Sequence, residues 1–149
     1  MARIGLISDT HGLLREQAVE ALRGSELIVH GGDVGKAEIL QALRRIAPVT
    51  AVRGNIDTAG PCSTLPETAA VAGIYVLHNL GDLDLDPAAA GFRMVVSGHS
   101  HQPGSFEKNG VLYVNPGSAG RRRFGLPITV ARFESAVLPW RVEFIDLDR

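Results

Sequence analysis

The chain carries a series of short motifs rich in Asp, Asn and His, and each motif follows directly on an apolar run. In chain order they are Asp9-Thr10-His11, Gly32-Asp33, Gly54-Asn55, His78 and Gly98-His99-Ser100-His101. Asp offers hard oxygen ligands, neutral imidazole offers nitrogen, and Asn adds a neutral oxygen without charge. Such a set of side chains suits two adjacent divalent cations. The pattern therefore predicts a metal-dependent hydrolase.

Each motif taken alone has an ordinary explanation. Ser8, Asp9 and Thr10 are all suitable helix N-caps, Gly-Asp and Gly-Asn pairs are common in turns, and a lone histidine is more often structural than a ligand. The pair His99 and His101 is the most specific piece, because two histidines one residue apart after a buried strand are uncommon in turns. The hypothesis of a metal site depends on the series, since every motif would otherwise end a strand by coincidence.

The hydrophobic pattern of the first half predicts the elements that position these motifs. Apolar runs at residues 4–7, 27–29 and 49–52 indicate buried strands, and helical spacing at 13–22 and 37–46 predicts two helices between them. A β-α-β-α-β order predicts a parallel sheet with right-handed crossovers. Ligands of such sheets bind beyond the carboxyl ends of the strands, which is where the motifs fall.

The second half is expected to be mostly strands, after a loop over residues 57–67. Asp86-Pro87 predicts an N-cap followed by a short alanine-rich helix, and Asn109-Gly110 predicts a hairpin turn. We expect two sheets packed face to face with helices outside, in one domain over residues 1–149. The expected strands are residues 69–71, 74–77, 94–96, 105–107, 111–114, 128–133 and 141–145.

Composition excludes several other classes of protein. Of the 149 residues, 45% are hydrophobic and 21% are charged, which are ordinary globular values. A formal net charge of −1 gives no general attraction for nucleic acid or anionic lipid. No apolar stretch approaches the ~18–20 residues of a membrane span, and the first charges come too early for a signal peptide. We therefore expect a cytoplasmic protein.

The ordered motifs D-x-H, G-D, G-N, H and G-H-x-H resemble those of the calcineurin-like metallophosphoesterase superfamily. The short length, Asn55-Ile56-Asp57 and the later Asn115-Pro116-Gly117-Ser118 resemble its small YfcE-type phosphodiesterase branch. The resemblance extends from Ile4 to about Ser118 and is specific as a set, although each motif is short. It implies an α/β fold, a four-layer α/β/β/α sandwich of two mixed sheets flanked by helices, with a two-metal centre.

The resemblance also implies a role for each motif residue. One metal is expected on Asp9, His11, Asp33 and His101, and the other on Asp33, Asn55, His78 and His99, so that Asp33 bridges the two. Manganese is the first expectation, with iron, nickel or zinc as alternatives. A bridging water or hydroxide, its pKa lowered towards ~7, would attack phosphorus in line. The residues expected to take part in catalysis are Asp33, Asn55, Asp57 and His99.

Two positions depart from the superfamily pattern. Many members have a histidine after the Asn of G-N that protonates the leaving group, but here the residue is Ile56. Asp57 or a metal-bound water could take over that role. Asn79 follows His78 where Gly is usual; Asn also tolerates left-handed backbone, so the turn can be kept.

The predicted activity is hydrolysis of a small phosphoester, most simply a phosphodiester. A phosphomonoesterase or nucleotidase is the alternative within enzymes, and a non-catalytic protein-interaction scaffold of the same fold is the alternative outside them. A homo-oligomer is compatible with the sequence.

His30 is expected to be structural. At least two of Arg121, Arg122 and Arg123 are expected to be solvated, while one could reach the substrate phosphate.

Overall fold

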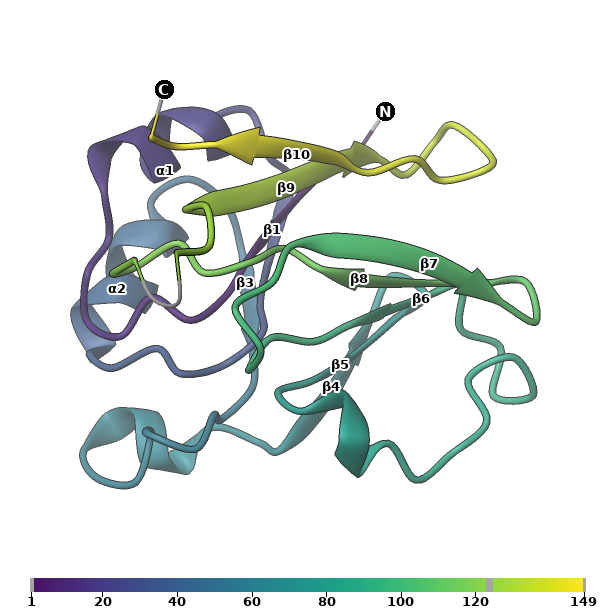
Figure 1. Ribbon diagram of the computed structural model, residues 1–149, viewed down its shortest axis with the longest axis horizontal. Helices are drawn as coiled ribbons and strands as arrows, with labels where there is room; N and C mark the ends of the chain where they lie inside the picture. The colour runs from purple at the N-terminus through teal and green to yellow at the C-terminus, as the bar shows by residue number, and fades with distance from the viewer. Residues whose placement is uncertain (1, 123–124, 149) are drawn as a thin grey trace.

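The first sheet forms from the apolar runs of the first half and from two strands at the end of the chain. A computed structural model describes residues 2–122 and 125–148 (Figure 1). β1 (Arg3–Ile7), β2 (Leu27–His30) and β3 (Val49–Ala51) are parallel, and α1 (Glu16–Leu22) and α2 (Ala37–Arg44) connect them. β9 (Thr129–Glu134) and β10 (Glu143–Asp146) extend the sheet in the order β10-β9-β1-β2-β3 with antiparallel pairing. The predicted β-α-β-α-β unit is confirmed.

The second sheet has the order β4-β5-β6-β8-β7 and is also mixed. Its strands are β4 (Thr68–Val71), β5 (Ile74–Leu77), β6 (Met94–Val96), β7 (Gly104–Lys108) and β8 (Val111–Asn115). β5, β6 and β8 are parallel, whereas the two edge strands are antiparallel to their neighbours. Asn109 and Gly110 join β7 to β8 with φ of 54° and 78°, the positive values that a two-residue hairpin turn requires.

Alternation along the strands distributes the apolar side chains over three cores. The two sheets face each other across fully buried strand residues, among them Leu6, Val29 and Val96. Ile7 and Ile28 point the other way, towards the helices. The outer face of the second sheet is covered by side chains from residues 80–92, next to the short 3-10 helix η2 (Leu80–Asp82). The α/β fold of two packed mixed sheets is therefore confirmed, with turns and η2 as its outermost layer on that side.

The two α-helices are shorter than the hydrophobic pattern predicted. α1 begins at Glu16 rather than near Leu13, because residues 8–12 form hydrogen bonds to the segment after β2 instead of helical ones. None of Ser8, Asp9 or Thr10 therefore caps this helix, whose N-cap is Arg15. No helix among the described residues is long and apolar enough to cross a membrane.

The predicted alanine-rich helix after Asp86 is wrong. The cap itself forms, because Asp86 Oδ1 accepts hydrogen bonds from the backbone N–H groups of Ala88 and Ala89 at 3.1 and 3.3 Å. The chain then turns at Gly91, which has φ of 87°, and Phe92 packs on the second sheet. One helical turn without a longer continuation is unfavourable, so the segment stays a turn. The loop predicted over residues 57–67 also contains a short 3-10 helix, η1 (Pro61–Thr64).

Candidate metal centre

The segments that follow β1, β2, β5 and β6 bring two carboxylates and three histidines together. Asp9 Oδ1 lies 3.8, 3.9 and 3.4 Å from Nε2 of His11, His78 and His101. Asp33 Oδ2 lies 3.4 Å from Nε2 of His11 and 3.3 Å from Nε2 of His78. Asp33 therefore stands between a histidine of each expected metal site, which is the position that a bridging ligand needs.

The chemistry of these atoms fits a cation better than it fits mutual hydrogen bonding. Asp9 Oδ1, His11 Nε2 and His78 Nε2 are buried and have no hydrogen-bond partner among the described residues. Ligands about 2.0–2.2 Å from one shared cation lie about 3–3.5 Å from each other. The separations of Asp33 from His11 and His78, and of Asp9 from His101, lie in this range. Buried polar atoms without partners are costly. Two bound cations, one beside His11 and one beside His78, would satisfy these atoms.

Backbone geometry at the ligands is strained in a consistent way. Asp9, His11, Asp33, His99 and His101 all have left-handed φ, between 48° and 73°. Residues other than glycine rarely adopt this conformation, and such strain is typical of functional sites. Hydrogen bonds from Asp9 N–H to the Gly32 carbonyl (3.0 Å) and from His11 N–H to the Asp33 carbonyl (2.9 Å) hold the two loops in place.

The glycine that begins each of two motifs allows a carboxylate to lie against the backbone. A Cβ on Gly54 would lie 2.1 Å from Asp33 Oδ1, and a Cβ on Gly98 would lie 2.4 Å from Asp9 Oδ2. Neither distance is possible for a real side chain. The Gly-Asn and Gly-His pairs are thus required by close packing around the carboxylates, in addition to any role in turns.

One oxygen of each carboxylate is held by the protein, which orients the other towards the histidines. Asp9 Oδ2 accepts hydrogen bonds from Ser8 Oγ at 2.7 Å and from His99 N–H at 3.2 Å, and Asp33 Oδ1 accepts one from Ile56 N–H at 2.9 Å. Orientation of this kind commonly tunes metal ligands. Ser8 was missed as a site residue in the sequence, where its place directly before Asp9 was the one available indication.

Electrostatics couples Asp33 to His78. Burial by itself raises the pKa of Asp33, but the neighbouring His78 and the hydrogen bond from Ile56 N–H outweigh it and hold the pKa below its ordinary value. Burial lowers the pKa of His78, yet Asp33 and the Gly31 carbonyl, 2.8 Å from Nδ1, raise the pKa above its usual range. The Asp33 charge thus favours the protonated form of His78. A cation bound to Nε2 would compete with that proton, as is usual for metal sites.

Asn55 and His99 lie on the open side of the centre. Both are exposed, His99 Nδ1 lies 3.3 Å from Asn55 Oδ1, and the His99 ring meets the His78 ring edge to face at 5.3 Å. His99 joins neither of the two groups of converging His and Asp ligand atoms, which contain Asp9, His11 and His101 in one case and Asp9, Asp33 and His78 in the other. The centre therefore has a buried half and an accessible half.

Asp57 is not placed to donate a proton to the leaving group. Its buried carboxylate accepts hydrogen bonds from the backbone N–H groups of Val34 (3.1 Å), Gly35 (3.0 Å) and Gly54 (2.9 Å). An oxygen that accepts N–H donors has no proton to give to a leaving group. The geometry instead makes Asp57 a clamp between the loop of Asp33 and the loop of Asn55.

His30 supports the centre from behind without reaching the ligand cluster. Thr10 Oγ1 donates to the Val34 carbonyl, so His30 Nε2, at 3.1 Å, donates to Thr10, while Nδ1 accepts from Gly32 N–H at 3.0 Å. These bonds fix a neutral imidazole. Burial lowers the pKa of His30 to about 4, and the nearby carboxylates offset this only in part.

Two clefts open from the accessible half of the centre and meet at His99 and Asn79, which line both. The larger, about 740 Å³, extends past Asn55 and has Glu67, Asp82 and Asp84 on its walls. The smaller, about 510 Å³, extends past Ser100 towards β7 and β8.

Asn79 is extended at φ −111° and caps η2 through its side chain, so it does not form the left-handed turn considered for it from the sequence.

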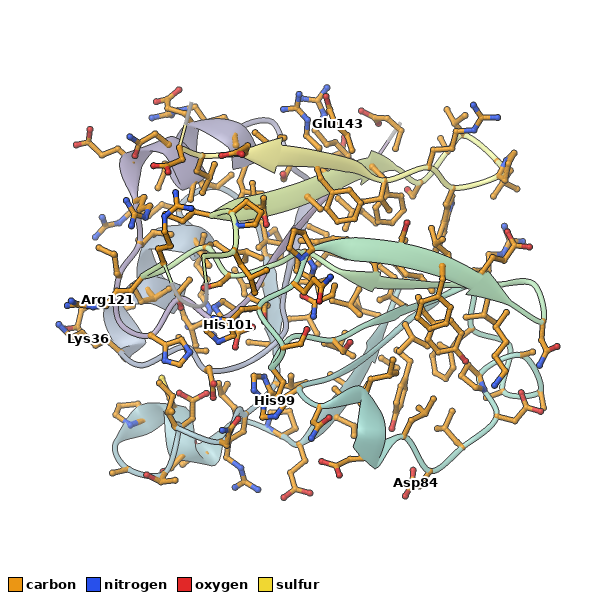
Figure 2. All side chains as sticks on the ribbon, viewed as in Figure 1. Lys36, Asp84, His99, His101, Arg121 and Glu143 are labelled. Carbon is orange, nitrogen blue, oxygen red and sulfur yellow. The ribbon has the colours of Figure 1, made fainter. Side chains whose placement is uncertain are left out.

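Arg121, the first residue of the arginine run, lies away from His99 and Asp84 in the view of Figure 2. Figure 2 shows Lys36 and Arg121 to one side of His101, and Asp84 beyond His99 on the other. Arg122 forms an ion pair with Asp148 and donates to the Leu126 carbonyl, so it has a structural role. Arg123 lies outside the described residues.

A family model described as the calcineurin-like phosphoesterase superfamily domain matches residues 2–136. The chain belongs to this superfamily. The family inferred from the motifs is thereby confirmed. A probable metallophosphoesterase of Methanothermobacter thermautotrophicus is 34% identical over an alignment of 130 residues. The match covers 77% of this chain and 76% of the relative.

Two solved structures show how widely the fold is shared. An archaeal phosphodiesterase superposes with a TM-score of 0.76 at 20% identity, covering 96% of this chain and 99% of its own. Vps29 of Chaetomium thermophilum superposes with a TM-score of 0.77 at 17% identity, covering 97% of this chain and 95% of its own. At these identities the likeness concerns the fold alone, so function has to be argued from the site.

We predict that Asp57→Asn loosens the clamp. The amide of Asn has one oxygen that can accept, while its NH2 group would face a backbone N–H donor. The free energy of unfolding should therefore fall by about 1–3 kcal/mol. Chemical denaturation measures this, with Asp86→Asn as the control, because Asn caps that exposed turn equally well. A variant as stable as the wild type would show that the clamp contributes nothing.

Acid should destabilise the wild type through His30. The folded protein keeps this imidazole neutral to about pH 4, whereas the unfolded chain takes up the proton near pH 6.5, so stability falls as the pH drops through this window. The loss is on the order of 3 kcal/mol. As the pH drops through the window, the free energy of unfolding of the wild type should fall relative to that of His30→Gln. Parallel curves would contradict the assignment.

Proposed function

We propose that this protein is a metal-dependent phosphodiesterase with a two-cation centre. The observation that carries the proposal is the convergence of Asp9, Asp33 and the histidines around buried atoms without partners, at a point where two clefts meet. The cations would be held by the two ligand sets that the family resemblance implies, sharing Asp33. Manganese remains the first choice, because mixed oxygen and nitrogen donors suit transition metals better than calcium.

Bound cations supply Lewis acidity, an activated water and a clamp for the oxygens of the phosphoryl group. The protein's part is to orient these groups. Ser8 and Ile56 N–H fix the carboxylate oxygens that face away from the histidines. His99 and Asn55 occupy the exposed side, where a phosphoester oxygen could approach them. Positioning and electrostatic stabilisation account for most of phosphoryl-transfer catalysis.

The two clefts favour a diester over a monoester. A diester has two ester arms, and the clefts that share His99 offer a separate space for each. A monoester would fill only one of them. The fold of a known archaeal phosphodiesterase is consistent with this preference. Phosphomonoesterase activity is the second candidate within the same centre.

A non-catalytic scaffold is the competing proposal from outside enzymes, and the shared fold of Vps29 keeps it open. A scaffold has no need for a complete ligand set. Here every expected ligand position is occupied by Asp, Asn or His, and the strained backbone at five of them is maintained at a cost. These features support an enzyme.

Metal analysis tests the centre directly. We expect two cations per chain in loaded wild type, and a loss of both sites together with activity in Asp33→Ala, because the shared carboxylate contributes to each. His99→Ala should lose one cation. Elemental analysis and turnover of bis(p-nitrophenyl) phosphate give the readouts, with Asp86→Asn as the control. At most one cation in the wild type, or near-normal turnover by Asp33→Ala, would exclude the two-cation proposal.

Leaving-group dependence tests the consequence of Ile56. The Ile56 side chain is apolar and 43% exposed, and Asp57 accepts only N–H groups, so neither donates a proton. A general acid typically contributes ~10²–10⁴-fold; its absence predicts fast turnover of activated aryl diesters and much slower turnover of alkyl diesters. Ile56→His should flatten this dependence. Similar chemical-step rates for both classes in the wild type would reveal another acid.

A further inference from the structure

The smaller cleft has an aromatic wall at the end away from the metal centre. Phe106 of the edge strand β7 is stacked on Tyr113 of β8, with ring centroids 4.8 Å apart and an interplanar angle of 5°. Tyr113 is 9% exposed and packs in the outer core, whereas Phe106 is 53% exposed. Both rings line the cleft that ends at His99. An exposed, flat and well-supported aromatic ring thus lies in the same cleft as the accessible half of the centre.

A simpler explanation is that Phe106 shields Tyr113 at a sheet edge, since single exposed apolar residues are common. Two observations go beyond it. The cleft joins this ring to His99, and polar side chains of Ser100, Gln102 and Asn115 line the space between them. The other cleft has no aromatic side chain of Phe, Tyr or Trp among its described lining residues and carries carboxylates instead. The two arms of a substrate would therefore meet different chemistry.

We propose that the smaller cleft binds the base of a nucleoside phosphoester, with Phe106 as its stacking platform. The inference rests on the proposed function, because it places the phosphate at the metal centre. Bases stack on exposed aromatic rings largely independently of their identity. The polar wall suits the edge of a base, which carries donors and acceptors, and the cleft volume is in the usual range for small-ligand sites.

The register of the hairpin relates Phe106 to the loop of the metal centre. Phe106 is two residues along β7 from Gly104, which pairs with Asn115 at the end of β8. At the usual rise of a strand this is about 7 Å. Asn115 in turn donates to the Gly98 carbonyl, directly before His99. The hairpin thus connects the strand that carries Phe106 to the loop that carries His99.

Binding of two phosphate monoesters to the metal-loaded protein tests the subsite, because they differ only in the arm. Adenosine 5′-monophosphate should bind about 5- to 100-fold more tightly than methyl phosphate. In Phe106→Ala and Phe106→Leu this ratio should fall towards one, whereas Phe106→Trp should keep it. Leu138→Ala, which removes another exposed apolar side chain, is the control and should also keep it. Calorimetry measures the ratio; a ratio that survives Phe106→Ala would overturn the proposal.

Adenosine without phosphate separates failure of the subsite from failure of the proposed function. Its addition should shift the ring proton resonances of Phe106 and Tyr113 in the wild type and also in Asp33→Ala, where the centre is disabled. Shifts without phosphate binding or turnover would leave the subsite in place and reject the enzyme. Turnover of bis(p-nitrophenyl) phosphate without any adenosine-induced shift or nucleotide preference would keep the enzyme and reject the subsite.

Discussion

The burial of two carboxylates beside the same histidines is the constraint on which the rest of this structure depends. Asp9 and Asp33 are almost fully buried, and removing ionised groups from water is costly unless positive charge and hydrogen bonds compensate. Ser8 and backbone N–H groups satisfy one oxygen of each. The other oxygens face His11 and His78. Left-handed ligand backbone and glycines in van der Waals contact with the carboxylates follow from this crowding.

The sandwich makes such a concentration of charge possible because it holds the ligand loops between rigid sheets. The parallel strands of both sheets end at one edge, and backbone hydrogen bonds join the loops there, from Gly98 N–H to the His78 carbonyl and from Ala119 N–H to the Ser8 carbonyl. Sites built at the ends of packed strands keep their geometry better than sites on long loops. Asp57 and His30 add a second layer of support from below.

Accessibility divides the centre into two unequal halves. His101 and Asp9 are buried, whereas Asn55 and His99 are exposed where the clefts meet. A substrate would therefore approach from the exposed half that contains Asn55 and His99. The walls of the two clefts, acidic in one and aromatic in the other, would select its two arms. The fold alone does not determine this selectivity, because Vps29 and an archaeal phosphodiesterase share the same architecture.

The sequence by itself determined the features that local pattern encodes: the apolar strands, the parallel unit of the first half, the turn at Asn109 and Gly110, and the ligand types at strand ends. Only the tertiary structure decided that Asp57 is a clamp, that the backbone N–H of His99 holds Asp9, and that the segment after Asp86 turns instead of forming a helix. The cleft beside Phe106 belongs to the same group. Periodicity and turn chemistry act between neighbours in the chain, whereas these features arise from contacts between residues that are distant in sequence or from packing that overrides local propensity.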